Sequence, residues 1–358
     1  MGVTMATNQH RLTGSTGGIG AGFSLIELMV AMLLGLVLLG GVTSLVVSMS
    51  RNHGEIQQKG ELFDNGRYTS SLLADAIRHA GFYGRYDEPT VGSGVTSLPD
   101  PCTTTVSSIK DHLGLAVQGY DAPTGSLPLG CLADADHVDG TDILVIRRAA
   151  RQETAVADLR EGMIYIQGGF QDYRLAAAAS DQSTNESTFD LTERDGDRTP
   201  IRRFRVDIFF VSPCLSKPDG STCADHTDGD EPIPSLRQLE LTVDGTDAAF
   251  EQVALTGGVD ELQFDYGIDG NDDGQPDEAS TSSAYLADPG SVSTWQNVVT
   301  VRVHSLGRTM DAVTGYEDER SYTLGTAGTV GPFNDAYKRH LFSRTARVVN
   351  RSSRRETE

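Results

Sequence analysis

An uncharged apolar run near the N-terminus constrains this chain more than any other feature. No Asp, Glu, Lys or Arg occurs between Leu28 and Ser50, where the sequence reads LMVAMLLGLVLLGGVTSLVVSMS. As an α-helix this run would be about 35 Å long, enough to cross a hydrocarbon core of about 30 Å. It is also longer than the apolar part of a secretory signal peptide. The sequence therefore predicts a membrane-spanning helix, and an ordinary single-pass anchor is one interpretation of it.

A single carboxylate stands at the start of this run. Glu27 lies within the segment FSLIELMVAM. A carboxylate in lipid costs a few kcal/mol unless it is paired, so an ionisable residue at this place is a functional candidate. The alternative is that Glu27 lies at the headgroup boundary and has no role of its own.

The residues around Glu27 carry a family resemblance. Gly22-Phe23-Ser24-Leu25-Ile26-Glu27 resembles the recognition sequence of prepilin peptidase. The resemblance implies that the leader, residues 1–22, is removed by cleavage between Gly22 and Phe23, and that the new amino group of Phe23 is methylated. In a fibre, Glu27 would then pair with the terminal amine of a neighbouring subunit, since an unpaired charge in an apolar bundle is heavily penalised.

The segment that follows the apolar run continues a helical pattern. No proline occurs before residue 89, and residues 51–84 place apolar side chains on one helical face. We expect one helix from Ser24 to about Ala80, with a membrane half (residues 23–50) and an amphipathic half (residues 51–84), ended by Gly81 or Gly84. The apolar face is predicted to contain Ile56, Phe63, Leu73, Ile77 and Ala80.

The remainder, residues 85–358, is predicted to be a globular head rich in β-strands. Alternating or β-branched runs predict strands at Asp142–Arg148, Met163–Gln167, Phe204–Val211, Leu236–Val243, Phe250–Leu255, Glu261–Tyr266, Val298–His304 and Leu341–Val349. Turn-rich stretches separate them at 86–140, 177–200, 212–235 and 269–294. No βαβ alternation is present, so the expected class is α+β, with the long helix packed on an antiparallel sheet with long loops, as in the type IV pilin fold.

Four cysteines lie in the predicted head. Pairing nearest neighbours, Cys102 with Cys131 and Cys214 with Cys223, is the simplest of the three possible connectivities. Such bridges are typical of an extracytoplasmic protein. Zinc is the rival interpretation, but the spacing lacks Cys-x2-Cys and no histidine pair accompanies it.

An Asp-rich segment in the head has the spacing of a calcium loop. Residues 268–278 read IDGNDDGQPDE, and the nine residues from Asp269 to Asp277 are close to the first nine positions of an EF-hand loop. Oxygen atoms at alternate positions suit a hard cation such as calcium. Ser280 stands where that loop places its bidentate glutamate, so Glu278 or a distant carboxylate would have to substitute, and a plain acidic turn is the alternative. The predicted ligands are Asp269, Asn271, Asp273, Asp277 and the main-chain carbonyl of Gln275.

Several further segments resemble PilW-type minor pilins. They are residues 72–84, residues 258–269, residues 295–303 and residues 340–351. The resemblance implies a minor pilin of a type IV pilus that helps to initiate or cap the fibre. It also implies partners, namely prepilin peptidase, other minor pilins, the major pilin and a large tip adhesin. The expected location is the inner membrane, with the head in the periplasm, and later the fibre at the cell surface.

Two other functions are compatible with the same features. One is a J-type minor pseudopilin of a type II secretion system, and the other is a tip adhesin, a binding module on a pilin anchor. Catalytic motifs such as His-Glu-x-x-His and Gly-x-Ser-x-Gly do not occur, so we expect no enzyme. The net charge of −21 argues against nucleic acid as a partner.

Overall fold

The computed structural model describes residues 22, 24–86, 91–92, 95–229, 231–277 and 285–355. The leader up to residue 21, the predicted methylation site Phe23, the predicted substitute ligand Glu278, and Ser280 lie outside the described residues. The chain divides between Glu55 and Ile56 into two compact units, which are described separately below.

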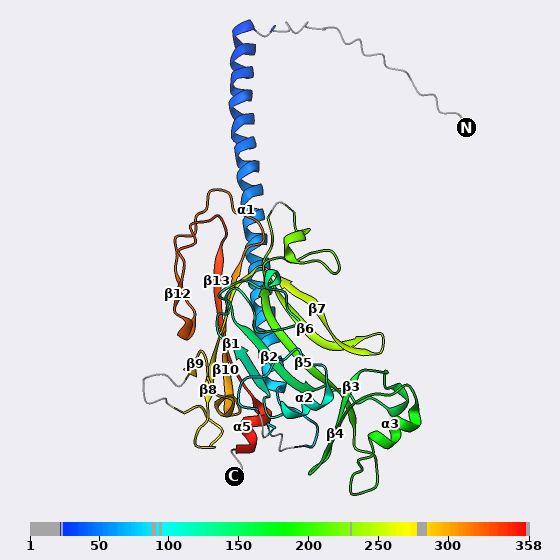
Figure 1. The fold of residues 1–358 in the computed structure, drawn as a ribbon. Helices are drawn as coiled ribbons and strands as arrows, with labels where there is room; N and C mark the ends of the chain where they lie inside the picture. The colour runs from blue at the N-terminus through cyan, green and yellow to red at the C-terminus, as the bar shows by residue number, and fades with distance from the viewer. Residues whose placement is uncertain are drawn as a thin grey trace, which may run out of the picture. The chain divides into compact units, whose positions relative to one another are not determined.

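One long helix confirms the prediction made from the N-terminal pattern. Helix α1 spans Leu25–His79, 55 residues (Figure 1). It ends just before Gly81, whose φ of +71° is a left-handed conformation that glycine adopts without strain. The N-terminal unit contains the first part of this helix, and the C-terminal unit contains the remainder.

Within the C-terminal unit, one face of α1 is buried. Leu73, Ile77 and Ala80 are fully buried as predicted. Ile56 and Phe63 were expected on the same face, but their side chains are 67% and 38% exposed. Gly66 takes the central place on the buried face instead, because the ring of Phe342 lies against it so closely that a Cβ atom there would be 2.1 Å from the ring.

The larger of the sheets has seven antiparallel strands. Strand β5 pairs with β2, β3 and β6, while β1, β4 and β7 lie at the ends of the pairing. Figure 1 shows β2, β5, β6 and β7 running side by side. The strands are β1 (Val117–Tyr120), β2 (Ile143–Ala149), β3 (Ile164–Gly168), β4 (Tyr173–Ala177), β5 (Ile201–Ser212), β6 (Ser235–Asp244) and β7 (Asp247–Gly257).

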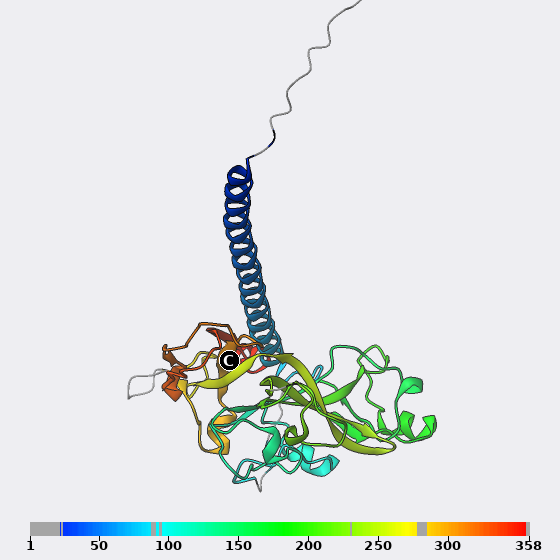
Figure 2. The ribbon, with the colours of Figure 1, turned by 90° about the horizontal axis from the view of Figure 1, so that it is seen from above.

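The remaining strands form a four-stranded and a two-stranded antiparallel sheet. The order in the four-stranded sheet is β13-β10-β8-β9, and β11 pairs with β12. These strands are β8 (Val259–Ile268), β9 (Tyr285–Leu286), β10 (Val298–Arg308), β11 (Tyr322–Thr323), β12 (Thr329–Val330) and β13 (Arg339–Arg347). Short helices lie between or after the strands: α2 (Val106–Asp111), α3 (Gln182–Thr188), α4 (Val292–Trp295) and α5 (Val349–Arg355). Figure 2 shows the same elements from above.

The main core of the C-terminal unit joins α1 to both larger sheets. Side chains of α1 pack together with residues of β2, β5, β8 and β10 and with the indole of Trp295. A second core covers the opposite side of the seven-stranded sheet, where α2 contributes Ile109. The central strand β2 and most of β5 are therefore buried on both faces of the seven-stranded sheet, whereas the outer strands β4 and β7 are partly exposed.

Asp142 links the two larger sheets at the start of β2. Its main-chain N–H donates to Leu262 O at 2.8 Å, and its carboxylate accepts N–H bonds from Phe264 at 2.7 Å and Ala122 at 2.8 Å. Burial raises the pKa of this carboxylate to about 8, although the two N–H bonds oppose that shift. One main-chain and one side-chain hydrogen bond from Asp142 to β8 thus join the two sheets, which the structure keeps separate where the sequence predicted one sheet.

Every predicted strand exists, although its ends differ from the prediction by up to four residues, and after the last strand the chain forms a helix that was not predicted. The last strand was expected to reach Val349, and the structure ends β13 at Arg347 and begins α5 at Val349. The reason is that Asn350 turns back to the end of α1, where its side-chain amide donates to Ala80 O at 3.1 Å. The expected turn-rich stretches 86–140 and 177–200 also contain elements that the pattern missed, namely α2, β1 and α3.

Candidate functional site

The first turn of α1 contains the predicted assembly residue. Gly22 and Ser24 precede the helix, and Ser24 O accepts the N–H of Leu28 at 3.1 Å. Glu27 is exposed in this first turn. Its place in the first turn puts the side chain beside the free main-chain N–H groups of the helix N-terminus. Phe23, whose amine would be its partner, lies outside the described residues.

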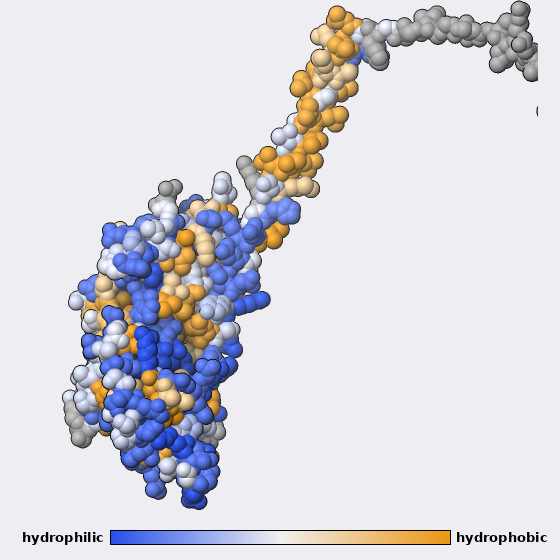
Figure 3. Space-filling view, turned by 90° about the vertical axis from the view of Figure 1, so that its right-hand side faces the viewer, coloured by the Kyte–Doolittle hydropathy of each residue, from blue (hydrophilic) through white to orange (hydrophobic). Residues whose placement is uncertain are grey.

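The N-terminal unit exposes a continuous apolar surface. From Leu25 to Ser50 every residue except Gly35 is exposed, and Figure 3 shows this part of α1 in hydrophobic colours. An 18-residue window of α1 reaches a mean hydropathy of 2.5, so the helix is long and apolar enough to cross a membrane. Each Å² of apolar surface left in water costs about 25 cal/mol of free energy. The segment therefore requires an apolar environment, which is either lipid or other helices.

The Asp-rich segment forms a tight loop after β8. The Asp269 side chain is fully buried and accepts the N–H groups of Gly274 at 2.9 Å and Asp273 at 3.2 Å. Asn271 and Asp273 likewise accept main-chain N–H bonds two residues ahead, at 3.0 and 2.8 Å. Asp277 closes the loop, since its carboxylate accepts the N–H of Gly270 at 2.6 Å. The structure therefore places the predicted metal ligands in one loop.

An arginine from the C-terminal helix neutralises part of this charge. Arg355 Nη1 lies 3.1 Å from the Asp269 carboxylate and 3.1 Å from that of Asp272. Its Nη2 also donates to the Asn297 side chain at 2.6 Å. Burial acts to raise the pKa of Asp269, but the bonds from Arg355 and Gly274 outweigh it and hold that pKa below its ordinary value.

The donor types of the loop suit a hard cation, but their arrangement is that of a closed turn. Within the part of the chain that the structure describes, no three His, Cys, Asp or Glu side chains converge as a metal ion requires. Gln275, the predicted carbonyl ligand, is held by its own N–H bond to Asp273. A calcium ion at this loop would compete with Arg355 for the Asp269 carboxylate.

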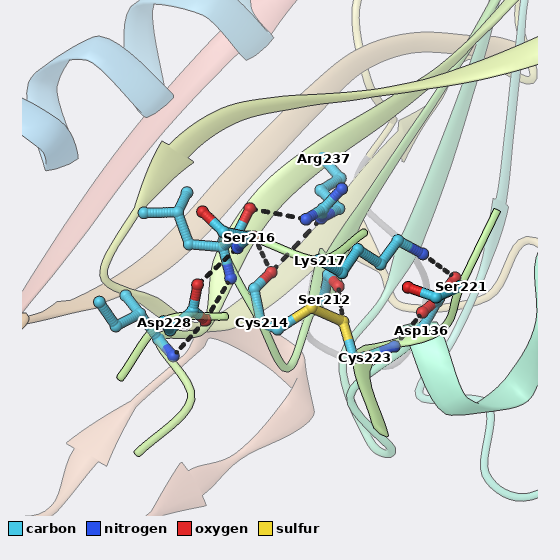
Figure 4. Close-up of a disulfide and its surroundings, with 12 residues drawn as sticks. Asp136, Ser212, Cys214, Ser216, Lys217, Ser221, Cys223, Asp228 and Arg237 are labelled. Atoms are coloured by element: carbon cyan, nitrogen blue, oxygen red, sulfur yellow. Dashed lines mark hydrogen bonds and ion pairs between the residues drawn. A yellow bond between two sulfur atoms is a disulfide. The ribbon is translucent and has the colours of Figure 1, made fainter. Parts of the chain in front are cut away.

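The two disulfides join the nearest cysteines in sequence. Cys102 pairs with Cys131, and Cys214 pairs with Cys223. Asp136, five residues after Cys131, contacts the Cys214–Cys223 loop, because its carboxylate accepts the N–H of Cys223 at 2.8 Å and pairs with the Lys217 ammonium (Figure 4). Asp136 is 5% exposed, so this link is buried. Cysteine spacing predicts the two disulfides, but no local pattern in the sequence predicts the contacts of Asp136 with Cys223 and Lys217.

A buried polar chain on the four-stranded sheet was also missed. The Asp265 carboxylate lies 3.1 Å from His304 Nε2, and His304 Nδ1 lies 2.9 Å from Ser343 Oγ. Thr326 donates both its N–H and its hydroxyl to Asp265. These residues lie on three adjacent strands and on the 309–338 segment, so no local spacing could reveal them. The chain attaches that segment to the sheet.

Comparisons with known proteins agree with these features. Residues 21–43 match the family model of the prokaryotic N-terminal methylation motif, which covers the cleavage sequence, Glu27 and the start of the apolar surface. Residues 222–350 match that of type IV pilus-assembly protein W. No curated protein and no solved structure gives a significant match.

The exposed apolar helix with its N-terminal methylation motif supports a pilin related to type IV pili. The second match, which runs from the Cys214–Cys223 loop to the start of α5, supports a type IV minor pilin of the PilW type.

Proposed function

We propose that this chain is a minor pilin that prepilin peptidase cleaves between Gly22 and Phe23 and that is then incorporated into a type IV pilus. Before assembly it is anchored in the inner membrane by α1, with the C-terminal unit in the periplasm. After assembly it lies in the fibre with other minor pilins and the major pilin. Its role is to initiate or cap the fibre, where it meets a large tip adhesin.

The observation that carries this proposal is the exposed first half of α1. The uncharged helical surface that begins directly after Glu27 would lie first in lipid and, after assembly, in the helical core of a fibre. On entering the fibre, Glu27 would pair with the methylated amine of Phe23 in a neighbouring subunit. Such a pair is favourable only in register, because either charge left alone among apolar helices is costly.

The fold of the C-terminal unit supports the same proposal. The second half of α1 packs on antiparallel sheets, which is the arrangement that the type IV pilin fold requires. Two disulfides are consistent with a periplasmic and extracellular location. The match of residues 222–350 to the type IV pilus-assembly protein W family supports a pilus rather than the J-type pseudopilin of a secretion system.

Calcium at the Asp269 loop is part of the proposal. Asp269, Asn271, Asp273 and Asp277 supply oxygen donors of the type that calcium prefers. Their function would be to stiffen the connection between β8 and β10, since the loop leaves β8 at Ile268 and Asp269 N–H bonds Asn297 O just before β10. Arg355 would share or yield the Asp269 carboxylate when the ion binds.

The test is the presence of the chain in purified fibres. In a strain that assembles pili and carries this gene, fibres sheared from the cells are probed with an antibody to the C-terminal unit. We expect a substoichiometric signal in the fibres, and few or no fibres after deletion of the gene. Normal fibre numbers in the deletion strain, with the protein confined to the membrane fraction, would contradict the proposal.

A further inference from the structure

Strand β7 has one edge that pairs with no other strand. In the described part of the chain it pairs only with β6, and Asp244 lies opposite Asp247 across a two-residue turn. In such a hairpin, alternate residues from this pair onward bond the partner strand, and the residues between them direct their N–H and C=O groups outward. The outward-directed residues are Ala248, Phe250 and Gln252. An edge of this kind is a template for pairing with another chain.

A pocket of about 890 Å³ lies beside β7. Residues 249–252 of the strand line it, so the pocket reaches both faces of β7, as a space along the edge of a strand does. The opposite wall contains residues 217–222 of the Cys214–Cys223 loop and Asp136, which binds that loop. We call this space the hairpin pocket. A strand occupies roughly 160 Å³ per residue at the usual sheet spacings, so the pocket has the volume of about five extended residues.

Three carboxylates of the hairpin pocket are available to a ligand. Asp219, Asp244 and Glu251 line the pocket and are exposed. Across the described ranges, none of the three takes part in an ion pair. Asp247, at the start of β7, adds a further exposed carboxylate beside them. Negative charge gathered at one cleft favours a positively charged occupant.

The two cations of the lining are already engaged elsewhere. Lys217 pairs with the buried carboxylate of Asp136 (Figure 4). The guanidinium of Arg237 donates to the main-chain oxygens of Cys214 at 3.4 Å and Leu215 at 2.7 Å. Neither cation pairs with one of the three exposed carboxylates, so the pocket keeps its negative character.

The side chain of Gln252 adds an unused donor at the same edge. Its Nε2 is buried and has no hydrogen-bond partner in the part of the chain that the structure describes. An unsatisfied buried donor costs about 1–3 kcal/mol, and an acceptor supplied by a ligand would remove that cost. A peptide main chain carries such acceptors at every residue.

The charges of the edge decide between its candidate occupants. A second copy of β7 would bring Asp247 and Glu251 of one chain against those of the other, and like charges opposite each other are destabilising. A small cation would leave the outward main-chain groups of β7 unpaired. An extended peptide with basic side chains satisfies both features, because its main chain pairs with the edge and its side chains reach the carboxylates.

We propose that the free edge of β7 binds an extended, Lys- or Arg-bearing segment of a partner protein as an added strand, with basic side chains in the hairpin pocket. This inference goes beyond the assembly role and does not rest on it, because β7 and the pocket lie entirely within the C-terminal unit. Failure of fibre incorporation and failure of peptide binding are therefore separate outcomes.

The experiment measures peptide binding to the full-length protein in micelles of a non-ionic detergent, by isothermal titration at low salt. The first probe is a blocked heptapeptide in which Lys alternates with Thr. The second has Glu in place of every Lys, which tests the charge. The third is the Lys peptide with every amide N-methylated, which keeps the charge but cannot donate main-chain hydrogen bonds. Hydrogen exchange, read by mass spectrometry, locates the bound peptide.

One variant tests the carboxylates of the chain itself. Glu251→Lys reverses one charge of the hairpin pocket. The matched control is Glu319→Lys, which makes the same change at an exposed residue of the 309–338 segment that does not line the pocket. Thermal unfolding of both variants reports whether they are folded.

We expect the Lys peptide to bind the wild type with a Kd below about 1 mM, and the other two peptides to bind at least about tenfold more weakly. Bound Lys peptide should slow exchange in β7 and not in β4, which lies at another end of the strand pairing. Glu251→Lys should weaken binding at least about fivefold, and Glu319→Lys should leave it within about twofold.

Four results would each overturn the proposal. They are absence of binding up to about 5 mM, equal binding of the Glu or the N-methylated peptide, protection outside β7, and full binding by a folded Glu251→Lys variant.

Discussion

The guanidinium of Arg355 lies 3.1 Å from the carboxylate of Asp269, in a loop whose spacing resembles that of a calcium site. The positive charge at this carboxylate is thus supplied by the C-terminal helix. Arg355 Nη1 also donates to the main-chain oxygen of Asp269 at 2.9 Å. The loop after β8, the start of β10 and helix α5 are therefore held at one point.

Calcium is predicted to raise the melting temperature of the wild-type protein. Binding that prefers the folded state adds about 2.7 kcal/mol at a hundredfold excess of ion over Kd. Magnesium should have much less effect, because it is smaller and retains its waters. Scanning calorimetry in chelator and then in calcium measures the difference. The double variant Asp269→Ala, Asp273→Ala should abolish it.

Replacing Arg355 distinguishes the two sources of positive charge that this loop can use, the guanidinium of Arg355 and a calcium ion. Arg355→Gln should lower the melting temperature in chelator, since it leaves the buried Asp269 carboxylate without its cation. Calcium should then restore part of the loss, and produce a larger rise than in the wild type. If calcium leaves the melting temperature of both proteins unchanged, with no heat of binding by titration, the loop is an acidic turn held by Arg355 alone.

Gly66 and Gly60 on α1 should respond to alanine in opposite directions. A Cβ at residue 66 would lie 2.1 Å from the ring of Phe342, so Gly66→Ala must displace that ring and should destabilise the fold by about 1–3 kcal/mol. Gly60 has no neighbouring atom within 4 Å, and Gly60→Ala should stabilise by up to about 1 kcal/mol through helix propensity. Urea unfolding of the two variants tests the pair, and a loss of stability at residue 60 equal to that at residue 66 would contradict the packing account.

Glu261 makes stability depend on pH. Burial raises the pKa of its carboxyl from 4.5 to about 7, and Asp260 adds to the shift while Arg339 opposes it. Because the pKa of Glu261 is higher in the folded state than in the unfolded state, folding favours the protonated carboxyl. The stability that the buried neutral Glu261 gives is fully present below about pH 4.5 and is lost as the pH rises through 7. Glu261→Gln should therefore be more stable than the wild type at pH 8, by up to about 3 kcal/mol, and not at pH 4. An equal difference at both pH values, in denaturant titrations, would exclude Glu261 as the cause.

The parts of the fold that sequence predicts are those set by local periodicity. The apolar run, the helix to His79 and the eight strands follow from spacing along the chain. The short β1, β4 and α2 carry too few residues to show a period. Phe63 was predicted to lie on the buried face of α1, whereas its side chain is 38% exposed and Gly66 is buried against Phe342. Gly66 is buried because the ring of Phe342 lies against it, and Phe342 is too distant in sequence for the helical pattern to predict this contact.

The candidate sites divide in the same way. The cleavage sequence, Glu27, the cysteines and the Asp-rich loop are local patterns, so their residues were found. Arg355 and the Asp265–His304 pair were not, because each contact joins segments far apart in the chain.

Glu27 should matter for fibre assembly and not for cleavage. Glu27→Ala removes the charge that would pair with the amine of Phe23, so we expect normal leader removal but a large decrease of the protein in sheared fibres. Glu61→Ala is the matched control, since Glu61 is exposed on the same helix within the C-terminal unit. Immunoblots of membrane and fibre fractions give the comparison. Wild-type amounts of the Glu27 variant in fibres would remove Glu27 from the mechanism.

Mass spectrometry of the mature N-terminus tests the pilin assignment most directly. The full-length protein is co-expressed with a prepilin peptidase, and the same expression without the peptidase is the control. Our account predicts a chain that begins with N-methylated Phe23, retains Glu27 and the whole apolar segment, and appears only when the peptidase is present. A chain that keeps its leader, or one that is cut near residue 50 as a secretory precursor would be, contradicts it.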